Sequence, residues 1–236
     1  MGKKIAIMQP YLFPYVGYFQ LISCVDEFII FDDVNYIKKG WINRNNFLFH
    51  GRKNLYTFPI KKASQNKKIV DIELIEGSEW KEDFLKKIYD NYFSSSEFRV
   101  VFPLIEDIVN YNESNLSLFI LQSLKKINSF LDIDTKLILS SNIKKNNELK
   151  SQDKIIEICK LRSANFYVNA IGGKELYDKN HFFNNHIALK FIESEIIIYE
   201  QINNKGDFES YLSIVDLLMN VSTDKIKKEL LNFKLI

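Results

Sequence analysis

The chain has 236 residues, enough for one large domain or two small ones. Apolar residues make up 46% of it and charged residues 26%, which is typical of a globular protein and excludes a disordered chain. The formal net charge of +2 gives no reason to expect binding to nucleic acid or to a membrane surface. The unusual feature is the content of 19 Phe and 12 Tyr, which either fill the core or form a surface for stacking ligand rings.

The cysteines, Cys24 and Cys159, lie in apolar helical segments with no partner at metal-ligand spacing. Buried thiols in a reducing compartment are therefore expected, and no metal site is. Only four apolar residues follow Lys4 before Gln9, too few for a signal peptide, and no stretch approaches the length of a spanning helix. These features predict a cytoplasmic protein with no membrane span.

The first part of the chain predicts a strand, a loop, a helix and a second strand. Residues 5–8 are an apolar run too short for a helix, and Pro10 and Pro14 prevent an earlier helix start. A short helix over 16–22 then leads into a strand over 28–31. This arrangement predicts two parallel strands joined by a right-handed crossover.

The middle of the chain predicts a β-hairpin followed by helices. Residues 47–49 and 55–60 form the hairpin, followed by a basic loop over 61–68. Period-two alternation over 70–74 predicts a half-exposed strand. Helical spacing of apolar residues predicts three helices, at 78–92, 96–111 and 116–131.

Strands and helices alternate again in the second half, which favours a mainly parallel sheet. The expected elements are strands at 136–139, 165–169, 187–192 and 196–199 and helices at 152–161, 211–220 and 223–232. The predicted fold is a single α/β domain over residues 1–236. It has a mainly parallel Rossmann-like sheet, an inserted β-hairpin and a helical sub-layer at about 76–133.

The loop after the first strand is the first candidate site. Open α/β sheets bind ligands beyond the carboxyl ends of their strands, and Gln9 lies at such an end. Gly17 opens the next helix, where free backbone N–H groups attract anions. Tyr11, Tyr15 and Tyr18 add phenol groups. We predict that these five residues bind substrate; the alternative is that the rings only pack the loop onto the sheet.

The same layout, a strand followed by a loop ending in ring–x–Gly–ring, is that of the HxGH nucleotidyltransferases. Tyr15 and Tyr18 stand where those enzymes have histidines, which argues against nucleotidyl transfer at this site.

Paired carboxylates end the second strand. Asp33, and after it Asp32, are the predicted catalytic groups, because a carboxylate in the crevice can take a proton from an amine nucleophile. The alternative is a solvated turn or a helix cap. Asn35 follows them and is predicted to bind substrate.

The segment after the paired carboxylates is a second candidate for substrate binding. Trp41 suits a base or sugar ring, and Arg44 suits a phosphate or carboxylate. Asn43 and Asn45 add amides. The alternative is a surface loop with one buried Trp.

Two segments are predicted to bind the cofactor. Lys61 and Lys62 in the basic loop could hold a diphosphate, and Gly172-Gly173 after a strand could cradle a phosphate. The ordinary alternatives are a solvated charged face for the lysines and a turn for the glycines.

Five segments resemble the signature of WbqC-like proteins, and they are spread over nearly the whole chain. The most specific is Ile7-Met8-Gln9-Pro10-Tyr11-Leu12-Phe13-Pro14-Tyr15-Val16-Gly17-Tyr18-Phe19. The others are Asp32-Asp33-Val34-Asn35-Tyr36, Gly40-Trp41-Ile42-Asn43-Arg44-Asn45, Asn169-Ala170-Ile171-Gly172-Gly173-Lys174-Glu175-Leu176-Tyr177 and Leu212-Ser213-Ile214-Val215-Asp216-Leu217-Leu218. Members of this family are usually associated with gene clusters for bacterial surface polysaccharide.

The resemblance implies an N-acyltransferase of O-antigen (lipopolysaccharide) biosynthesis. Acetyl-CoA would be the acyl donor and a nucleotide-linked amino-deoxysugar the acceptor. The chain has neither a hexapeptide repeat nor a Gly-rich pyrophosphate loop of the common acetyltransferase folds, so a different scaffold is expected. The alternatives are a glycosyl- or aminoacyl-transferase of the same pathway and a non-catalytic protein that binds a nucleotide sugar. Nucleic acid is not an expected partner, and a homodimer is left open.

Overall fold

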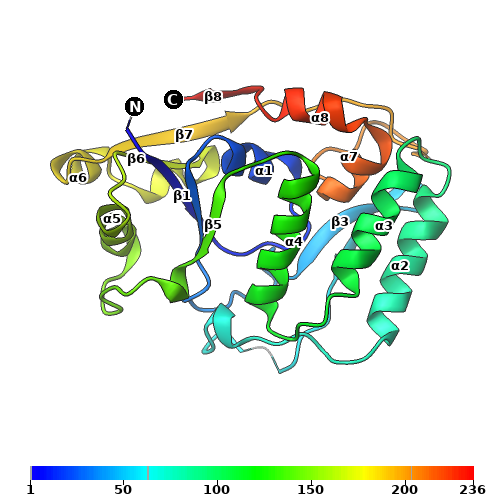
Figure 1. Ribbon diagram of the computed structural model, residues 1–236, viewed down its shortest axis with the longest axis horizontal. Helices are drawn as coiled ribbons and strands as arrows, with labels where there is room; N and C mark the ends of the chain where they lie inside the picture. The colour runs from blue at the N-terminus through cyan, green and yellow to red at the C-terminus, as the bar shows by residue number, and fades with distance from the viewer. Residues whose placement is uncertain (1, 63, 203) are drawn as a thin grey trace.

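The computed structural model describes residues 2–62, 64–202 and 204–236. Within these ranges, the main sheet has six strands in the order β5-β2-β1-β6-β7-β8. All are parallel to their neighbours except β8, which is antiparallel to β7. The strands are β1 (Lys4–Met8), β2 (Glu27–Ile30), β5 (Lys136–Leu139), β6 (Phe166–Ala170), β7 (Ala188–Ser194) and β8 (Phe233–Leu235). The predicted mainly parallel α/β sheet is therefore confirmed (Figure 1).

Helices cover both faces of this sheet (Figure 1). Successive side chains of β1 point to opposite faces, so each face has an apolar surface to bury. Ala6 points into the larger core, whereas Ile5 and Ile7 point into a smaller core on the opposite face. The helix α1 (Val16–Ser23) packs into the larger core, and α5 (Ser151–Leu161) and α6 (Lys179–Asn184) pack into the smaller one. Burial on both faces explains the continuously apolar β1.

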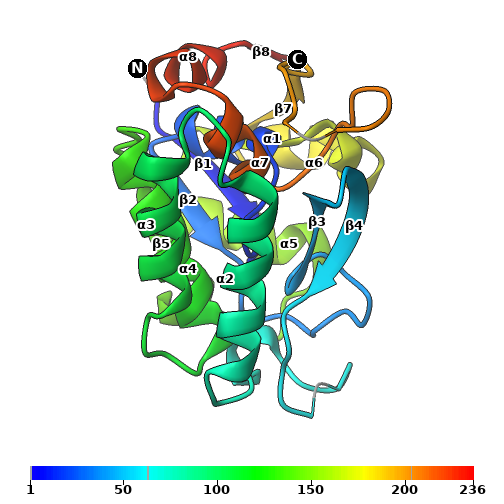
Figure 2. The same cartoon turned by 90° about the vertical axis from the view of Figure 1, so that its right-hand side faces the viewer.

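The helical layer and the hairpin are confirmed as separate elements beside the sheet. The layer consists of α2 (Glu79–Tyr92), α3 (Phe98–Val109) and α4 (Leu116–Phe130), which stand side by side in Figure 2. The hairpin pairs β3 (Arg44–Phe49) with β4 (Arg52–Thr57). Its turn has positive φ at His50 and Gly51, as tight hairpins require.

Two predicted strands are wrong. Residues 70–74 form no strand; the 3₁₀ turn η1 (Ile69–Asp71) is followed by single bridges to the hairpin side and to the start of α4. Residues 196–199 form no strand either, because β7 ends at Ser194 and no sheet pairing of the described residues continues beyond it. Of the isoleucines in this apolar run, only Ile197 is buried, and Ile196 and Ile198 are exposed.

The end of the chain also differs from the prediction. The closing helices are α7 (Ile214–Asn220) and α8 (Thr223–Glu229), so the first starts three residues later and the second ends three residues earlier than expected. After α8 the chain turns back to pair as β8, where the N–H of Phe191 donates to the carbonyl of Ile236 over 2.9 Å. The sequence also did not predict α6 and the short turns η2 (Ser140–Asn142) and η3 (Ile171–Leu176).

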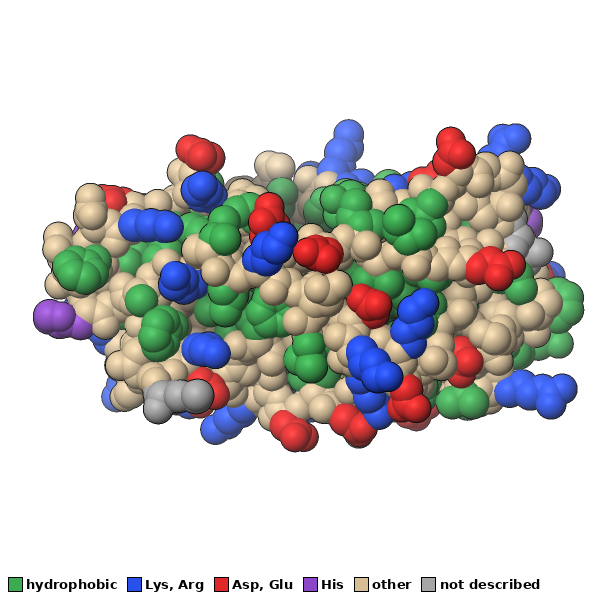
Figure 3. Space-filling view, turned by 90° about the horizontal axis from the view of Figure 1, so that it is seen from above, with side chains coloured by type: hydrophobic (Ala, Val, Ile, Leu, Met, Phe, Trp, Pro, Cys, Tyr) green, Lys and Arg blue, Asp and Glu red, His purple; other side chains and the backbone are tan. Residues whose placement is uncertain are grey.

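The face that carries β7, β8 and α8 shows both charge signs interspersed with apolar side chains and no basic stripe (Figure 3). Among the described residues, no helix combines the length and hydropathy needed to cross a bilayer.

Candidate functional site

The carboxyl ends of β1 and β6 meet at the point where the strand order reverses. From β1 the chain moves to β2 on one side, and it later returns through α5 to β6 on the other. Ligand crevices form at such points. A cleft of about 580 Å³ opens here, lined from β1 by Met8 and Gln9 and from β6 by Asn169 and Ala170.

We call this cleft the aromatic lobe, because aromatic side chains form one of its walls. Tyr11, Tyr15 and Trp41 line it, and the rings of Tyr11 and Trp41 lie 6.3 Å apart. Trp41 is 50% exposed, so its ring is available to a ligand. Gln9, Gly17, Tyr18 and these three aromatic residues therefore all line one crevice.

Hydrogen bonds fix the loop that carries these rings. The hydroxyl of Tyr11 donates to Oδ1 of Asn45 over 2.9 Å, and the hydroxyl of Tyr18 donates to the carbonyl of Gln9 over 2.8 Å. The carbonyl of Phe13 accepts from Asn45 and from the hydroxyl of Ser213. Burial raises the pKa of Tyr11 and of Tyr18, so both remain donors at neutral pH.

Gly17 has a steric role. A Cβ atom at this position would overlap the ring of Tyr15 and lie 3.1 Å from Oγ of Ser194. Only glycine lets the Tyr15 ring lie against the start of α1.

Asn43, Arg44 and Asn45 stand behind the aromatic lobe and do not line it. Nδ2 of the buried Asn43 donates to the carbonyl of Phe58 over 2.7 Å. Nε of Arg44 donates to the carbonyl of Gly40 over 3.0 Å, and its guanidinium lies 5.8 Å from the Trp41 ring. These three residues hold the Trp41 turn, and the structure does not place their side chains for direct substrate contact.

A second, more polar cavity of about 470 Å³ adjoins the aromatic lobe, and we call it the polar lobe. The two cavities share four lining residues: Phe31, Ile155, Leu176 and Tyr177. Among the described residues, the polar lobe is lined by three lysines and one carboxylate: Lys68, Lys150, Lys154 and Asp33. Asn35 is exposed at its edge.

Asp33 is ion-paired with two buried lysines. Its Oδ2 lies 2.9 Å from Nζ of Lys145 and 3.0 Å from Nζ of Lys154. Burial by itself would raise the pKa of Asp33, but Lys145, Ser140 and Lys154 together outweigh it, so the pKa lies below its ordinary value. A carboxylate with a lowered pKa is a weak base.

The side chain of Asp32 contacts a different partner from that of Asp33, namely Ser141. Its carboxylate accepts from the backbone N–H of Ser141 over 2.9 Å and from the Ser141 hydroxyl over 2.7 Å. Burial raises its pKa. Asp32 is fully buried and outside both lobes, so it ties β2 to η2.

The predicted cofactor residues separate into two places. Gly172 and Gly173 line the aromatic lobe at the start of η3. Lys61 and Lys62 line a different surface depression, where Nζ of Lys61 pairs with Glu73 and Glu76. The glycine pair and the lysine pair therefore line different depressions.

The sequence placed Asn169 and Tyr177 in a segment of the family signature but assigned neither to the site, and it missed the two lysines that hold Asp33. Asn169 carried a usable signal, because it is the polar residue at the end of an apolar strand, as Gln9 is. Lys145 and Lys154 carried none, since they lie far from Asp33 in the chain and nothing distinguishes them from the other lysines of the sequence.

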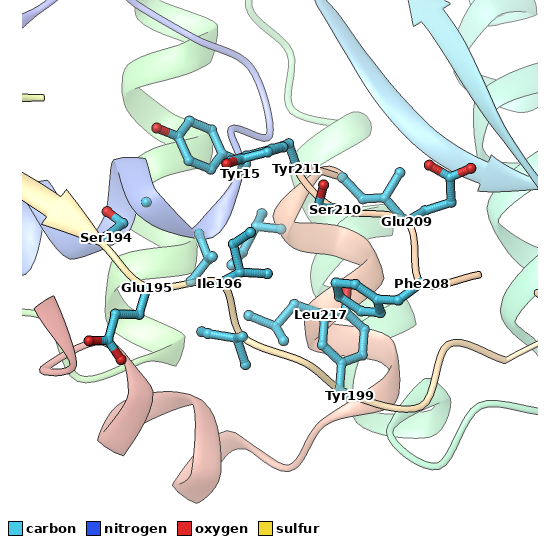
Figure 4. Close-up of a pocket in the computed structure, with 15 residues that line it drawn as sticks. Tyr15, Ser194, Glu195, Ile196, Tyr199, Phe208, Glu209, Ser210, Tyr211 and Leu217 are labelled. Atoms are coloured by element: carbon cyan, nitrogen blue, oxygen red, sulfur yellow. The ribbon is translucent and has the colours of Figure 1, made fainter. Parts of the chain in front are cut away.

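A small, partly open cavity of about 50 Å³ lies beside Gly17, between the end of β7 and α7 (Figure 4). Tyr15 lies next to Tyr211 there, with ring centroids 6.0 Å apart. Asp216 accepts from the hydroxyls of Tyr92 and Tyr199 over 2.8 and 2.6 Å. These contacts fix α7, which in turn holds the loop before α1.

Within the described residues, no cluster of three or more His, Cys, Asp or Glu side chains could hold a metal ion.

The chain belongs to the WbqC-like protein family, whose family model matches residues 9–228. It is 30% identical over 226 residues to an uncharacterized protein of Mycobacterium tuberculosis, Rv1507c, covering 94% of this chain and 95% of that protein. No solved structure matches the chain.

Proposed function

We propose that this protein is an N-acyltransferase that transfers an acetyl group from acetyl-CoA to a nucleotide-linked amino-deoxysugar for bacterial surface polysaccharide. One observation carries the proposal. At the switch point of the sheet, an apolar aromatic lobe and a lysine-lined polar lobe join into one crevice. Rings suit the first lobe and a diphosphate suits the second, which is the composition of a nucleotide sugar.

The excess of positive charge in the polar lobe supports the diphosphate assignment. Lys68, Lys150 and Lys154 face one carboxylate, Asp33, which is already paired. Asp33 keeps Lys154 in place, and the cations can then meet phosphate oxygens. Lys61 and Lys62, in their separate depression, have no role in this proposal.

In the proposed reaction, the neutral sugar amine attacks the thioester carbon at the junction of the two lobes. A C–N bond forms, the C–S bond breaks, and the proton from nitrogen passes to the leaving thiolate directly or through water. Asp33 was the sequence-based choice for the base, but its ion pairs weaken it for that role. We assign it to holding the lysines. We place this reaction in the cytoplasm, where thioester donors are made.

A thiol-release assay with acetyl-CoA and a panel of dTDP-linked amino sugars tests the proposal, with calorimetry of the same sugars alongside. Thiol release that requires both the amine and the protein supports it. Failure with every amine overturns it.

The second candidate is a non-catalytic protein that binds a nucleotide sugar, and the pairing of Asp33 favours it. This candidate predicts that the nucleotide sugar binds in the calorimeter with no thiol release, whereas a glycosyltransferase would release a free nucleoside diphosphate instead.

A further inference from the structure

Tyr177 stands at the junction where the two lobes meet, because it lines both cavities. Its ring packs edge-on against Tyr167 and Phe182, with centroids 5.5 and 5.7 Å away. These contacts hold the phenol in one orientation beside the crevice.

A chain of hydrogen bonds ends at the Tyr177 hydroxyl. The N–H of Ala170 donates to Oδ1 of Asn169 over 2.6 Å, so the Asn169 Nδ2 must face the tyrosines. Nδ2 donates to the Tyr167 hydroxyl over 2.7 Å and to the Tyr177 hydroxyl over 3.1 Å. Gly173 packs onto this amide: a Cβ there would lie 3.2 Å from Oδ1.

The buried Tyr167 hydroxyl accepts a hydrogen bond from Asn169 and donates one to Tyr177. Burial raises its pKa well above the ordinary value, so it keeps its proton. It donates that proton to the Tyr177 hydroxyl over 3.1 Å. The oxygen of Tyr177 therefore accepts two hydrogen bonds, and among the described residues its own O–H has no acceptor.

We propose that the Tyr177 hydroxyl donates a hydrogen bond to the carbonyl oxygen of the acyl thioester as that oxygen becomes negatively charged. This rests on the proposed acyl transfer. As the C–N bond forms, the carbonyl electron pair moves onto oxygen; it returns when the C–S bond breaks, and the Tyr177 proton stays on Tyr177. A donor already polarised by two hydrogen bonds and fixed by packing is suited to this charge. Tyr177 is thus a catalytic residue, and Tyr167 and Asn169 are positioning residues.

The test compares Tyr177→Phe with Tyr167→Phe, using steady-state thiol release by the full chain. Tyr177→Phe keeps the ring and loses the donor, so kcat falls by about 100-fold while KM changes by less than about threefold. Tyr167→Phe removes one of the two polarising bonds, so kcat falls by about tenfold with KM unchanged. Tyr89→Phe, on the exposed face of α2, is the matched control and keeps wild-type kcat.

The possible failures are distinguishable. If wild-type protein releases thiol and Tyr177→Phe keeps the wild-type kcat, whether or not its KM rises, the role of Tyr177 is overturned and the acyltransferase proposal stands. If wild-type protein releases no thiol with any amine, both are overturned. If Tyr177→Phe melts at a lower temperature than wild type, Tyr167→Phe decides whether the role of Tyr177 holds. A wild-type kcat in Tyr167→Phe, at unchanged KM, then overturns the inference.

Discussion

The two lobes of the crevice are held in place by different forces. In the aromatic lobe, hydrogen bonds from phenols and amides to backbone carbonyls and to Asn45 fix the loop that carries the rings. In the polar lobe, one carboxylate fixes two lysines by ion pairs. Hydrogen bonds between these neutral groups are unaffected by mild acid, whereas the ion pairs of Asp33 are lost once the pH falls through its lowered pKa. Changes in pH and in charge should therefore affect the polar lobe and leave the aromatic lobe intact.

The largest effect is expected from Asp33→Asn, which leaves Lys145 and Lys154 buried without a counter-charge. We expect the free energy of unfolding at pH 7 to fall by about 2 kcal/mol, less than for a fully dry pair because the lobe is open to water. Urea unfolding measures it. Lys61→Gln, which breaks two exposed ion pairs, is the control, and an equal loss in both variants would contradict the assignment.

The same ion pairs predict the direction of a pH effect. The folded-state pKa of Asp33 is lowered, so its stabilising contribution is fully present above the ordinary aspartate value and is lost as pH falls through the folded-state pKa. The stability difference between wild type and Asp33→Asn should therefore shrink in acid, below about pH 4. Urea unfolding over a pH series checks this, and a constant difference would show that the ion pairs are not its source.

A smaller effect is expected from Gly17→Ala, which acts on the aromatic lobe. The added Cβ displaces the Tyr15 ring, and we expect a loss of about 1 kcal/mol after the helix-propensity gain is subtracted. Gly172→Ala is the matched substitution, since a Cβ there meets nothing within 4 Å. Thermal melts should show a lower midpoint for the first variant and an unchanged or higher one for the second, at every pH between 5 and 9.

Trp41→Ala should change stability least, because the ring is half exposed. Its effect should appear in ligand binding instead, as a Kd for the nucleotide sugar raised by about tenfold, measured by calorimetry. Trp41→Phe should recover part of the affinity. Wild-type affinity in Trp41→Ala would remove the ring from the proposed binding surface.

The sequence located the crevice but not the roles of all its residues. Gln9 and the tyrosines were predictable because a polar residue at the end of a buried strand marks the ligand edge of a parallel sheet. Arg44 and Asn43 looked equally functional, yet Nε of Arg44 donates to the carbonyl of Gly40 and Nδ2 of Asn43 to that of Phe58, and neither side chain lines the aromatic lobe. Residue type alone did not separate the two groups, because the positions of the hydrogen-bond partners decide which side chains reach the crevice.

Local pattern determined much of the architecture of this protein. Continuous apolar runs specified buried parallel strands, and helical spacing specified the layer from α2 to α4. Tertiary structure alone decided the charge state and the contacts of the site. Lys145 and Lys154 reach Asp33 across more than a hundred residues of sequence, and Asn169 and Tyr167 direct the proton of Tyr177. A pKa or a free hydrogen-bond donor depends on which groups lie nearby in space, and periodicity in one chain carries no information about that.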